Sequence, residues 1–461
     1  MNWSSVLTSM LPEHALLAGI VLLVVLDVAR SGARSTLLVS VLALAAATAA
    51  AAWLASIGYA GAPFPEHFSV SPTSSASKLI VLALALPVLL VSRDDFSEPT
   101  FHILLLSSLY GVCLLVSADS FLTLFLGLEI MSLPVYALVL LAFQRTASAE
   151  AALKYLVLGG TATATLLMGV ALLYGQGGSL AVSAFADALT TPATLSTVGI
   201  VLIIVAFFLK AAIVPFHAWA PDAYEGATVP VTAYMAAIIK AGVLLAVVRL
   251  FGAAQMAPPM TDLIAVLPLL SIIWGNLAAM RQASFRRMIA YSSIAHAGYL
   301  FYALLGEASG RFQAVAFYLL TYGVMNVLAF SALPVDRDDA ARDRLDNLKG
   351  LFSRKPVAAV LIALSMLSLA GIPPLPGFIA KFLIFRNVMA AGFTLYGVLG
   401  LLASYLGIYF YLRVVQYLFM SAHEGTRAEG GSSRLAWTAS FICLVTAILI
   451  GVFPGWVIDR L

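Results

Sequence analysis

Residues 207–242 read FFLKAAIVPFHAWAPDAYEGATVPVTAYMAAIIKAG and place Lys210 and Lys240 in apolar sequence on either side of a proline-rich interruption. The whole chain is apolar: of its 461 residues, 62% are hydrophobic and 10% are charged. A soluble globular protein carries roughly 25% charged residues, so this chain has too few charged residues to cover the surface of a soluble globular protein. The composition therefore excludes a soluble enzyme, a disordered protein and a nucleic-acid-binding protein. It indicates a polytopic membrane protein surrounded by the lipid bilayer.

Apolar stretches long enough to cross about 30 Å of hydrocarbon recur along the chain without the period-two alternation of a β-barrel. We predict an all-α polytopic membrane protein with about 14 transmembrane helices. The predicted spans are 14–29, 36–57, 77–92, 99–118, 120–143, 149–175, 196–217, 228–251, 262–281, 286–306, 311–333, 356–391, 396–420 and 434–456. No basic residue precedes Arg30, so we expect the first span to be retained rather than cleaved. No linker divides the chain, and residues 1–461 are expected to form one transmembrane domain.

The distribution of positive charge orients these spans. Connections after the odd-numbered spans hold 15 of the 25 Lys and Arg residues, including Arg145 and Arg427. The opposite connections hold only Lys78, Arg249, Arg311 and Arg460. Because cytoplasmic loops carry the excess of positive charge, both termini are expected outside. The charged connection 334–355 is interpreted as a solvated loop, with a contact to a neighbouring subunit as the alternative.

The remaining six basic residues lie at membrane depth: Lys154, Lys210, Lys240, Lys381, Arg386 and Arg413. A lysine at a span centre costs roughly 2.5–3.5 kcal/mol on insertion scales, so these lysines need carboxylates, water or one another. Glu129 lies at comparable depth and could pair with one of them. Intramembrane ionisable groups in a line typically form a proton relay. Lys154 could instead snorkel to the membrane surface, and His217 and His296 could be relay groups or hydrogen-bonded core residues.

Two predicted spans contain prolines beside a lysine. The seventh contains Pro215 after Lys210, and the twelfth contains Pro373 and Pro374 before Lys381. Such breaks in corresponding positions of two halves point to inverted repeats with an ion path at the midplane. We therefore predict helices 1–3 in 1–98, two inverted five-helix repeats in 99–251 (helices 4–8) and 262–420 (helices 9–13), and helix 14 in 434–456. The alternative is that the prolines only kink packed helices.

The two cysteines form no CxxC motif or Cys/His cluster, so no metal or cofactor is expected in this chain. Trp274, Tyr291, Tyr299 and Tyr302 are interpreted as packing or interface residues.

Several stretches in combination carry a family resemblance. Besides residues 207–242 they are GLEIMSLPVYAL at 127–138, EAALKYLVLGG at 150–160, NLAAMRQASFRRMIAYSSIAHAGYL at 276–300 and MLSLAGIPPLPGFIAKF at 366–382. Over roughly residues 100–420 the chain resembles the antiporter-like, proton-translocating membrane subunits of respiratory complex I, the NADH-quinone oxidoreductase, and is most similar to their subunit N group. Mrp-type sodium/proton antiporter subunits are the nearest alternative.

The resemblance implies roles for individual residues. Glu129 would pair with Lys210, Lys154 would modulate that pair, Lys240 would be the central relay group, Lys381 would exchange protons at the end, and His296 would belong to the polar chain between the last two. It implies a bacterial inner membrane location with periplasmic termini, and subunits K and M as neighbours. FMN, Fe–S clusters and quinone would be bound by other subunits. A non-transporting structural subunit and a quinone or haem enzyme remain as further alternatives.

Overall fold

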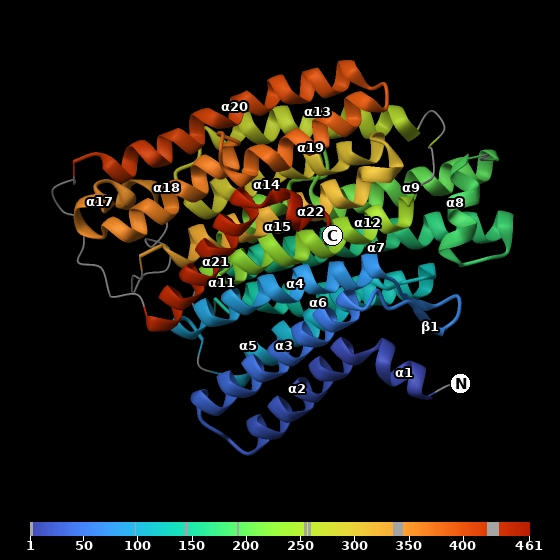
Figure 1. Ribbon diagram of the computed structural model, residues 1–461, viewed down its shortest axis with the longest axis horizontal. Helices are drawn as coiled ribbons and strands as arrows, with labels where there is room; N and C mark the ends of the chain where they lie inside the picture. The colour runs from blue at the N-terminus through green and yellow to red at the C-terminus, as the bar shows by residue number, and fades with distance from the viewer. Residues whose placement is uncertain are drawn as a thin grey trace. The chain divides into compact units, whose positions relative to one another are not determined.

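The structure is a computed structural model that describes residues 3–96, 98–142, 146–190, 193–252, 256, 260–334, 344–421 and 433–461. The described residues contain 13 helices long and apolar enough to cross a membrane, which confirms the predicted all-α membrane fold (Figure 1). They are α2 (Leu11–Val28), α3 (Ala33–Ser56), α4 (Pro72–Val91), α5 (Pro99–Val116), α6 (Phe121–Leu140), α7 (Thr146–Gly177), α9 (Thr194–Ala211), the span made of α11 (Val229–Tyr234) and α12 (Lys240–Phe251), α13 (Met260–Ala279), α14 (Phe285–Tyr302), α15 (Ala308–Ser331), α20 (Thr394–Phe419) and α21 (Arg434–Val452).

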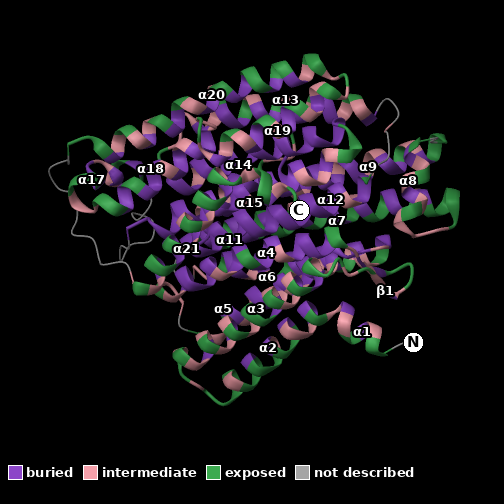
Figure 2. Ribbon diagram, viewed as in Figure 1, coloured by how far each residue is buried: buried purple, intermediate pink, exposed green. Residues whose placement is uncertain are grey.

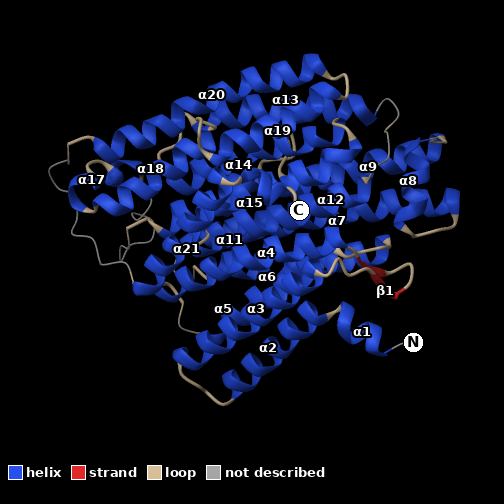
Figure 3. Ribbon diagram, viewed as in Figure 1, coloured by secondary structure: helices blue, strands red, loops and turns tan. Residues whose placement is uncertain are grey.

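Two regions differ from the predicted spans. The twelfth span, predicted as 356–391, consists of two shorter helices, α18 (Pro356–Ala370) and α19 (Pro376–Ala390). A small antiparallel hairpin, β1 (Gly61–Phe64) and β2 (Phe68–Val70), fills part of the connection between α3 and α4 (Figure 3). The remaining short helices are α1 (Trp3–Ser9), α8 (Val182–Thr190), α10 (Trp219–Gly226), α17 (Leu351–Arg354) and α22 (Pro454–Ile458). Arg145, Arg427 and the part of the charged connection at 335–343 lie outside the described residues.

The third predicted span begins earlier than expected. Helix α4 begins at Pro72, not at residue 77, because the fixed φ of proline suits the first helical position and its missing N–H would have no intrahelical partner there. Lys78 therefore lies inside the helix, where its side chain is completely buried, and not in a connection as its charge suggested.

The chain divides into two compact units. The first unit comprises Met1–Leu86, Phe96–Ala211 and Ile239–Ile264, and in it α5 packs along α6 and α7 along α9. Gly111 allows the first of these close contacts, because a Cβ atom there would collide with the backbone of Met131. The second unit comprises Pro87–Asp95, Ala212–Ile238 and Ala265–Leu461, and in it α15 packs against α18, α19 and α21.

Burial differs sharply between helices. Nearly every residue of the span Val229–Phe251 is buried and α14 and α15 are almost as enclosed, whereas most residues of α2 and α3 are at least partly exposed (Figure 2). The exposed side chains of α2 and α3 are largely apolar, as in Val21, Leu22 and Leu42. Apolar surface of this length and continuity suits contact with lipid or with other membrane helices.

Candidate functional site

In the first unit, the carboxylate Glu129 and the ammonium Lys210, both predicted to lie at membrane depth, are close together. Lys210, in the last turn of α9, places its Nζ 3.7 Å from Oε1 of Glu129 on α6. The ammonium also donates hydrogen bonds to Ser132 Oγ at 3.2 Å and to the Tyr136 hydroxyl at 3.4 Å. Because Glu129, Ser132 and Tyr136 recur at helical spacing, one face of α6 supplies all three acceptors.

Helix α7 holds the carboxylate from the other side. The Thr163 hydroxyl donates to Glu129 Oε1 at 2.6 Å. Gly159, one turn earlier on α7, leaves the space that the Tyr136 hydroxyl occupies, since a Cβ atom at that glycine would overlap it. Glu129 is 24% exposed and Lys210 only 6% exposed, so the carboxylate is the more accessible partner in this chain. The geometry allows protonation of Glu129 while Lys210 keeps two neutral hydrogen-bond acceptors.

Lys154 occupies a different setting. It lies on α7 with 44% of its side chain exposed and forms an ion pair of 2.7 Å with Glu150, one turn earlier on the same helix. This face of α7 is the outer surface of the unit, so the pair resembles an exposed helical ion pair more than a core contact.

Lys240 is buried in the first unit, with 7% of its surface exposed. A π-helical turn, Met235–Ile239, immediately precedes it in the span. Turns of this kind inside α-helices are frequent at functional sites, because the extra residue leaves a backbone carbonyl without its regular partner. Helix α12 packs against α5 and α9, and Gly242 brings its backbone close to Val112 of α5.

In the second unit, Lys381 lies beside the interruption between α18 and α19. Helix α18 ends at Ala370, and Gly371 takes the left-handed backbone conformation with a φ of 84°. Pro373 and Pro374 follow before α19 begins. Lys381 Nζ donates to the Ala370 carbonyl at 3.0 Å and lies 5.2 Å from the centre of the Tyr299 ring. A backbone carbonyl at the end of α18 thus becomes an acceptor for a buried lysine.

The segment after α9 contains the other interruption. Regular helix ends at Ala211, Pro215 follows in a series of turns, and α10 begins at Trp219. Asp222 and Glu225 of α10 both accept hydrogen bonds from Arg287 of α14, at 2.7 Å and 3.0 Å. The acidic residues of the PDAYEGA stretch therefore anchor this segment. His217 accepts a hydrogen bond of 2.9 Å from Trp274 Nε1, and the Trp274 side chain is half-exposed.

His296 lies in the interior of the second unit, on α14, and is 3% exposed. Its Nε2 is 3.0 Å from the Tyr411 hydroxyl and its Nδ1 is 2.8 Å from the Tyr318 hydroxyl. The two tyrosines come from α20 and α15. This histidine is therefore held by hydroxyls on both ring nitrogens.

One buried ion pair escaped prediction from the sequence. Glu13 Oε1 and Lys78 Nζ lie 2.6 Å apart in the first unit, and both side chains are 0% exposed. Hydropathy placed both residues at the edges of predicted spans. Pro12 and Pro72 are the sequence signals that could have predicted the burial of Glu13 and Lys78. Each proline marks the first turn of a helix, and each charged residue follows it within that helix.

Comparison with known proteins gives a consistent family. The family model for NADH:quinone oxidoreductase/Mrp antiporter transmembrane proteins matches residues 118–407. NADH-quinone oxidoreductase subunit N of Pelobacter propionicus is 38% identical over 94% of this chain and 94% of its own length. The protein called NADH-quinone oxidoreductase subunit N 1 of Aquifex aeolicus is 34% identical over 100% of this chain and 98% of its own length.

Solved structures agree with these sequence matches. A chain of respiratory complex I from Thermus thermophilus superposes with a TM-score of 0.85 at 33% identity, covering 97% of this chain and 98% of the other. A chain of the Mrp complex from a Dietzia species has a TM-score of 0.84 at 22% identity, covering 100% of this chain and 96% of the other, and shows that the fold is shared. The chain therefore belongs to the NADH:quinone oxidoreductase/Mrp antiporter family of transmembrane subunits, within the group of NADH-quinone oxidoreductase subunit N.

Proposed function

We propose that this chain is a proton-translocating membrane subunit of an NADH-quinone oxidoreductase. The observation that carries the proposal is the contact between Glu129 and Lys210, a carboxylate and an ammonium 3.7 Å apart inside a membrane-spanning fold. Charges at that depth are costly and typically mark ion or proton pathways. The chain's identity of 34–38% to proteins named subunit N supports this reading over the alternatives.

The mechanism begins with a change at the Glu129–Lys210 pair. Electron transfer from NADH to quinone takes place in other subunits, which hold the FMN, the Fe–S clusters and the quinone. A charge displacement in a neighbouring subunit weakens the pair, and Lys154 on α7 modulates it. Loss of the Glu129 charge makes the Lys210 ammonium less stable, since an opposite charge nearby favours the charged form. The proton that Lys210 releases passes to Lys240.

The second unit completes the path. His296 belongs to the polar chain that receives protons from Lys240, and Lys381 exchanges them with the opposite side of the membrane. The interruptions at Pro215 and at Pro373 and Pro374 provide backbone carbonyls that can solvate a moving proton, and the hydrogen bond from Lys381 to the Ala370 carbonyl supports this role. We place these interruptions in two inverted repeats, 99–251 and 262–420.

The proposal includes an assembly. The chain resides in a bacterial inner membrane with both termini on the periplasmic side, and subunits K and M are its membrane neighbours. The apolar, exposed faces of α2 and α3 would lie against lipid or such a neighbour.

The test is a lysine substitution in the complete complex. Lys210→Met should reduce NADH-driven proton uptake by inverted membrane vesicles by about tenfold or more, a typical effect of losing one proton-transfer group. NADH oxidation with an artificial electron acceptor reports assembly independently. Lys349→Met serves as control, because that lysine lies outside the spans and pairs with Asp346.

Three outcomes separate the alternatives. Unchanged pumping in an assembled Lys210→Met complex would leave only a structural role. Loss of sodium/proton exchange with NADH oxidation intact would favour an Mrp-type antiporter. Loss of proton uptake in the assembled complex supports the proposal.

A further inference from the structure

The His296 imidazole is part of a longer hydrogen-bonded chain within the second unit. Ser292 Oγ, one helical turn before His296, lies 2.5 Å from the Tyr411 hydroxyl, which in turn contacts His296 Nε2 at 3.0 Å. His296 Nδ1 contacts the Tyr318 hydroxyl at 2.8 Å. Four groups from three helices are thereby connected by three contacts, and all four are buried.

Every member of this chain can both donate and accept a proton. A hydroxyl has one donor hydrogen and two lone pairs, and a neutral imidazole has one nitrogen of each kind. The chain can therefore be polarised in either direction without leaving a member unsatisfied. The Tyr302 hydroxyl, also buried in this unit, is different, because it donates to the Ala265 carbonyl, which cannot pass a proton on.

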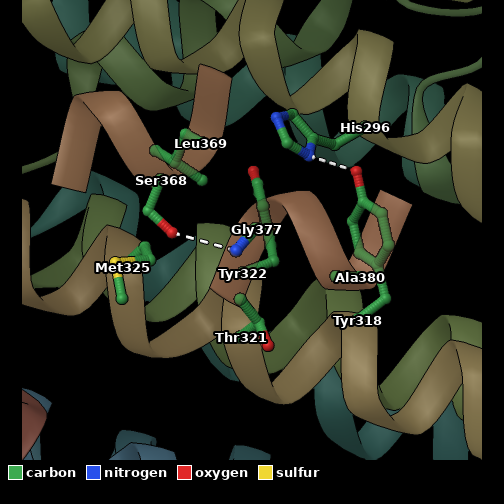
Figure 4. Close-up of a pocket in the computed structure, with 9 residues that line it drawn as sticks. All are labelled: His296, Tyr318, Thr321, Tyr322, Met325, Ser368, Leu369, Gly377 and Ala380. Atoms are coloured by element: carbon green, nitrogen blue, oxygen red, sulfur yellow. Dashed lines mark hydrogen bonds between the residues drawn. The ribbon is translucent and has the colours of Figure 1, made fainter. Parts of the chain in front are cut away.

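The Tyr318 end of the chain borders a small cavity. His296, Tyr318, Tyr322, Ser368 and Gly377 line it together with Ala380, the residue before Lys381 (Figure 4). The lining of the cavity is mostly apolar, with polar groups contributed by the histidine and tyrosine side, and it has room for about one water molecule, which needs two to four polar partners. Ser368 and Gly377 belong to the two helices that flank the interruption beside Lys381.

We propose that Tyr411 and Tyr318 are proton-relay groups on either side of His296, and that Ser292, Tyr411, His296 and Tyr318 form a proton wire leading into this cavity. This inference rests on the proposed function. It adds two tyrosines and a serine to the relay and gives His296 a named proton-transfer partner on each ring nitrogen.

The transfer balances without any change of oxidation state. A proton arrives at the Ser292 oxygen, and the Ser292 hydroxyl proton moves to Tyr411. The Tyr411 O–H bond breaks as an Nε2–H bond forms on His296. The Nδ1–H bond breaks as an O–H bond forms on Tyr318, and the earlier Tyr318 proton passes to a water molecule in the cavity. Rotation of the hydroxyls and a return of the histidine tautomer reset the chain.

The experiment compares three tyrosine-to-phenylalanine changes in the complete complex. Tyr318→Phe and Tyr411→Phe should each lower NADH-driven proton uptake by about tenfold or more. Tyr302→Phe is the matched control, because it also removes a buried hydroxyl from this unit but lies outside the wire, and its proton uptake should stay within about twofold of wild type. NADH oxidation with an artificial acceptor reports the amount of assembled complex.

A second measurement separates relay from support. Replacing Tyr318 or Tyr411 by a fluorinated tyrosine keeps the ring and the hydroxyl but changes how readily the phenol gives up its proton. If the tyrosine is a relay group, this replacement should change the rate of proton uptake and the solvent deuterium isotope effect on that rate. If its hydroxyl only supports the fold, both should stay at wild-type values. This measurement decides the matter even where a phenylalanine variant does not assemble.

The outcomes also distinguish this inference from the function on which it rests. Wild-type pumping in Tyr318→Phe and Tyr411→Phe, with pumping lost in Lys381→Met, would overturn the wire and leave the proposed function intact. Wild-type pumping in the assembled Lys210→Met and Lys381→Met complexes would overturn both.

Discussion

Replacing Glu13 by glutamine should destabilise the first unit by about 3–5 kcal/mol, because it removes one partner of a fully buried ion pair. Glu13 and Lys78 lie 2.6 Å apart with no exposed side-chain surface. Glutamine has nearly the same size as glutamate, so no cavity contributes to the loss. The Lys78 ammonium would keep the neutral amide oxygen of the glutamine and the Phe68 ring 5.0 Å away, and neither carries the negative charge that compensates an ammonium in the interior.

The Lys154–Glu150 pair provides a matched comparison. Its distance of 2.7 Å is almost the same, but the two side chains are 44% and 67% exposed. Exposed ion pairs are typically worth about 0.2–1 kcal/mol. Glu150→Gln should therefore have little effect, and the difference between the two glutamine variants isolates the contribution of burial.

The assay is heat stability of the assembled complex in membranes, followed by loss of the native complex on a gel. At roughly 2 °C per kcal/mol, the lower end of the range for a unit of this size, Glu13→Gln should lower the midpoint by about 6–10 °C. The double variant Glu13→Gln, Lys78→Met should recover much of this loss, because no isolated charge remains. A Glu13→Gln midpoint equal to that of Glu150→Gln, or a double variant whose loss equals the sum of the single losses, would refute the reasoning.

Three further predictions concern the contacts that hold the interrupted helices and the ends of spans. Gly377→Ala should prevent normal packing of α18 on α19, since its Cβ would collide with the Ser368 carbonyl, whereas Gly455→Ala meets open space and should assemble normally, as checked by the yield of intact complex. Arg287→Ala should cost about 1–3 kcal/mol by removing the charged donor shared by two partly exposed carboxylates of α10, measured as a lower heat-stability midpoint. Arg249→Lys should also lower that midpoint. The guanidinium donates two hydrogen bonds of 2.6 Å, to the Val116 carbonyl at the end of α5 and to the Ser69 hydroxyl of β2, and one ammonium cannot replace both. An unchanged midpoint would contradict this.

Hydropathy alone predicts most of this fold because lipid imposes a simple condition on it. Each crossing must be apolar and must satisfy its own backbone hydrogen bonds, so composition and span length suffice to locate a helix. Hydropathy is less informative at the ends of spans, because polar residues there can belong either to a helix or to a connection. The early start of α4 at Pro72 and the hairpin before it lie in such a region.

Pairing between distant residues is harder to predict from one sequence. That Lys210 and Glu129 lie at membrane depth follows from their neighbours in the chain, but their contact depends on how α6 and α9 pack. Resemblance to a family supplied that expectation. The Glu13–Lys78 pair had no such motif, and no motif pointed to Tyr318 or Tyr411 beside His296, because a hydroxyl's partner is fixed only by tertiary structure.

Glu13–Lys78 and Glu129–Lys210, two of the Glu–Lys pairs in the described part of the first unit, have the same chemistry but differ in distance and exposure. Lys78 and Glu13 are in direct contact and fully enclosed, so protonating that glutamate would strand the ammonium in the interior. Glu129 is partly exposed, lies 3.7 Å from Lys210, and the lysine already donates to two hydroxyl oxygens on α6. In the mechanism we propose, those oxygens remain as hydrogen-bond acceptors for Lys210 when Glu129 is neutralised, until the lysine proton moves on. Distance, exposure and alternative acceptors, rather than residue type, therefore distinguish the enclosed Glu13–Lys78 pair from the pair that we propose as a switch.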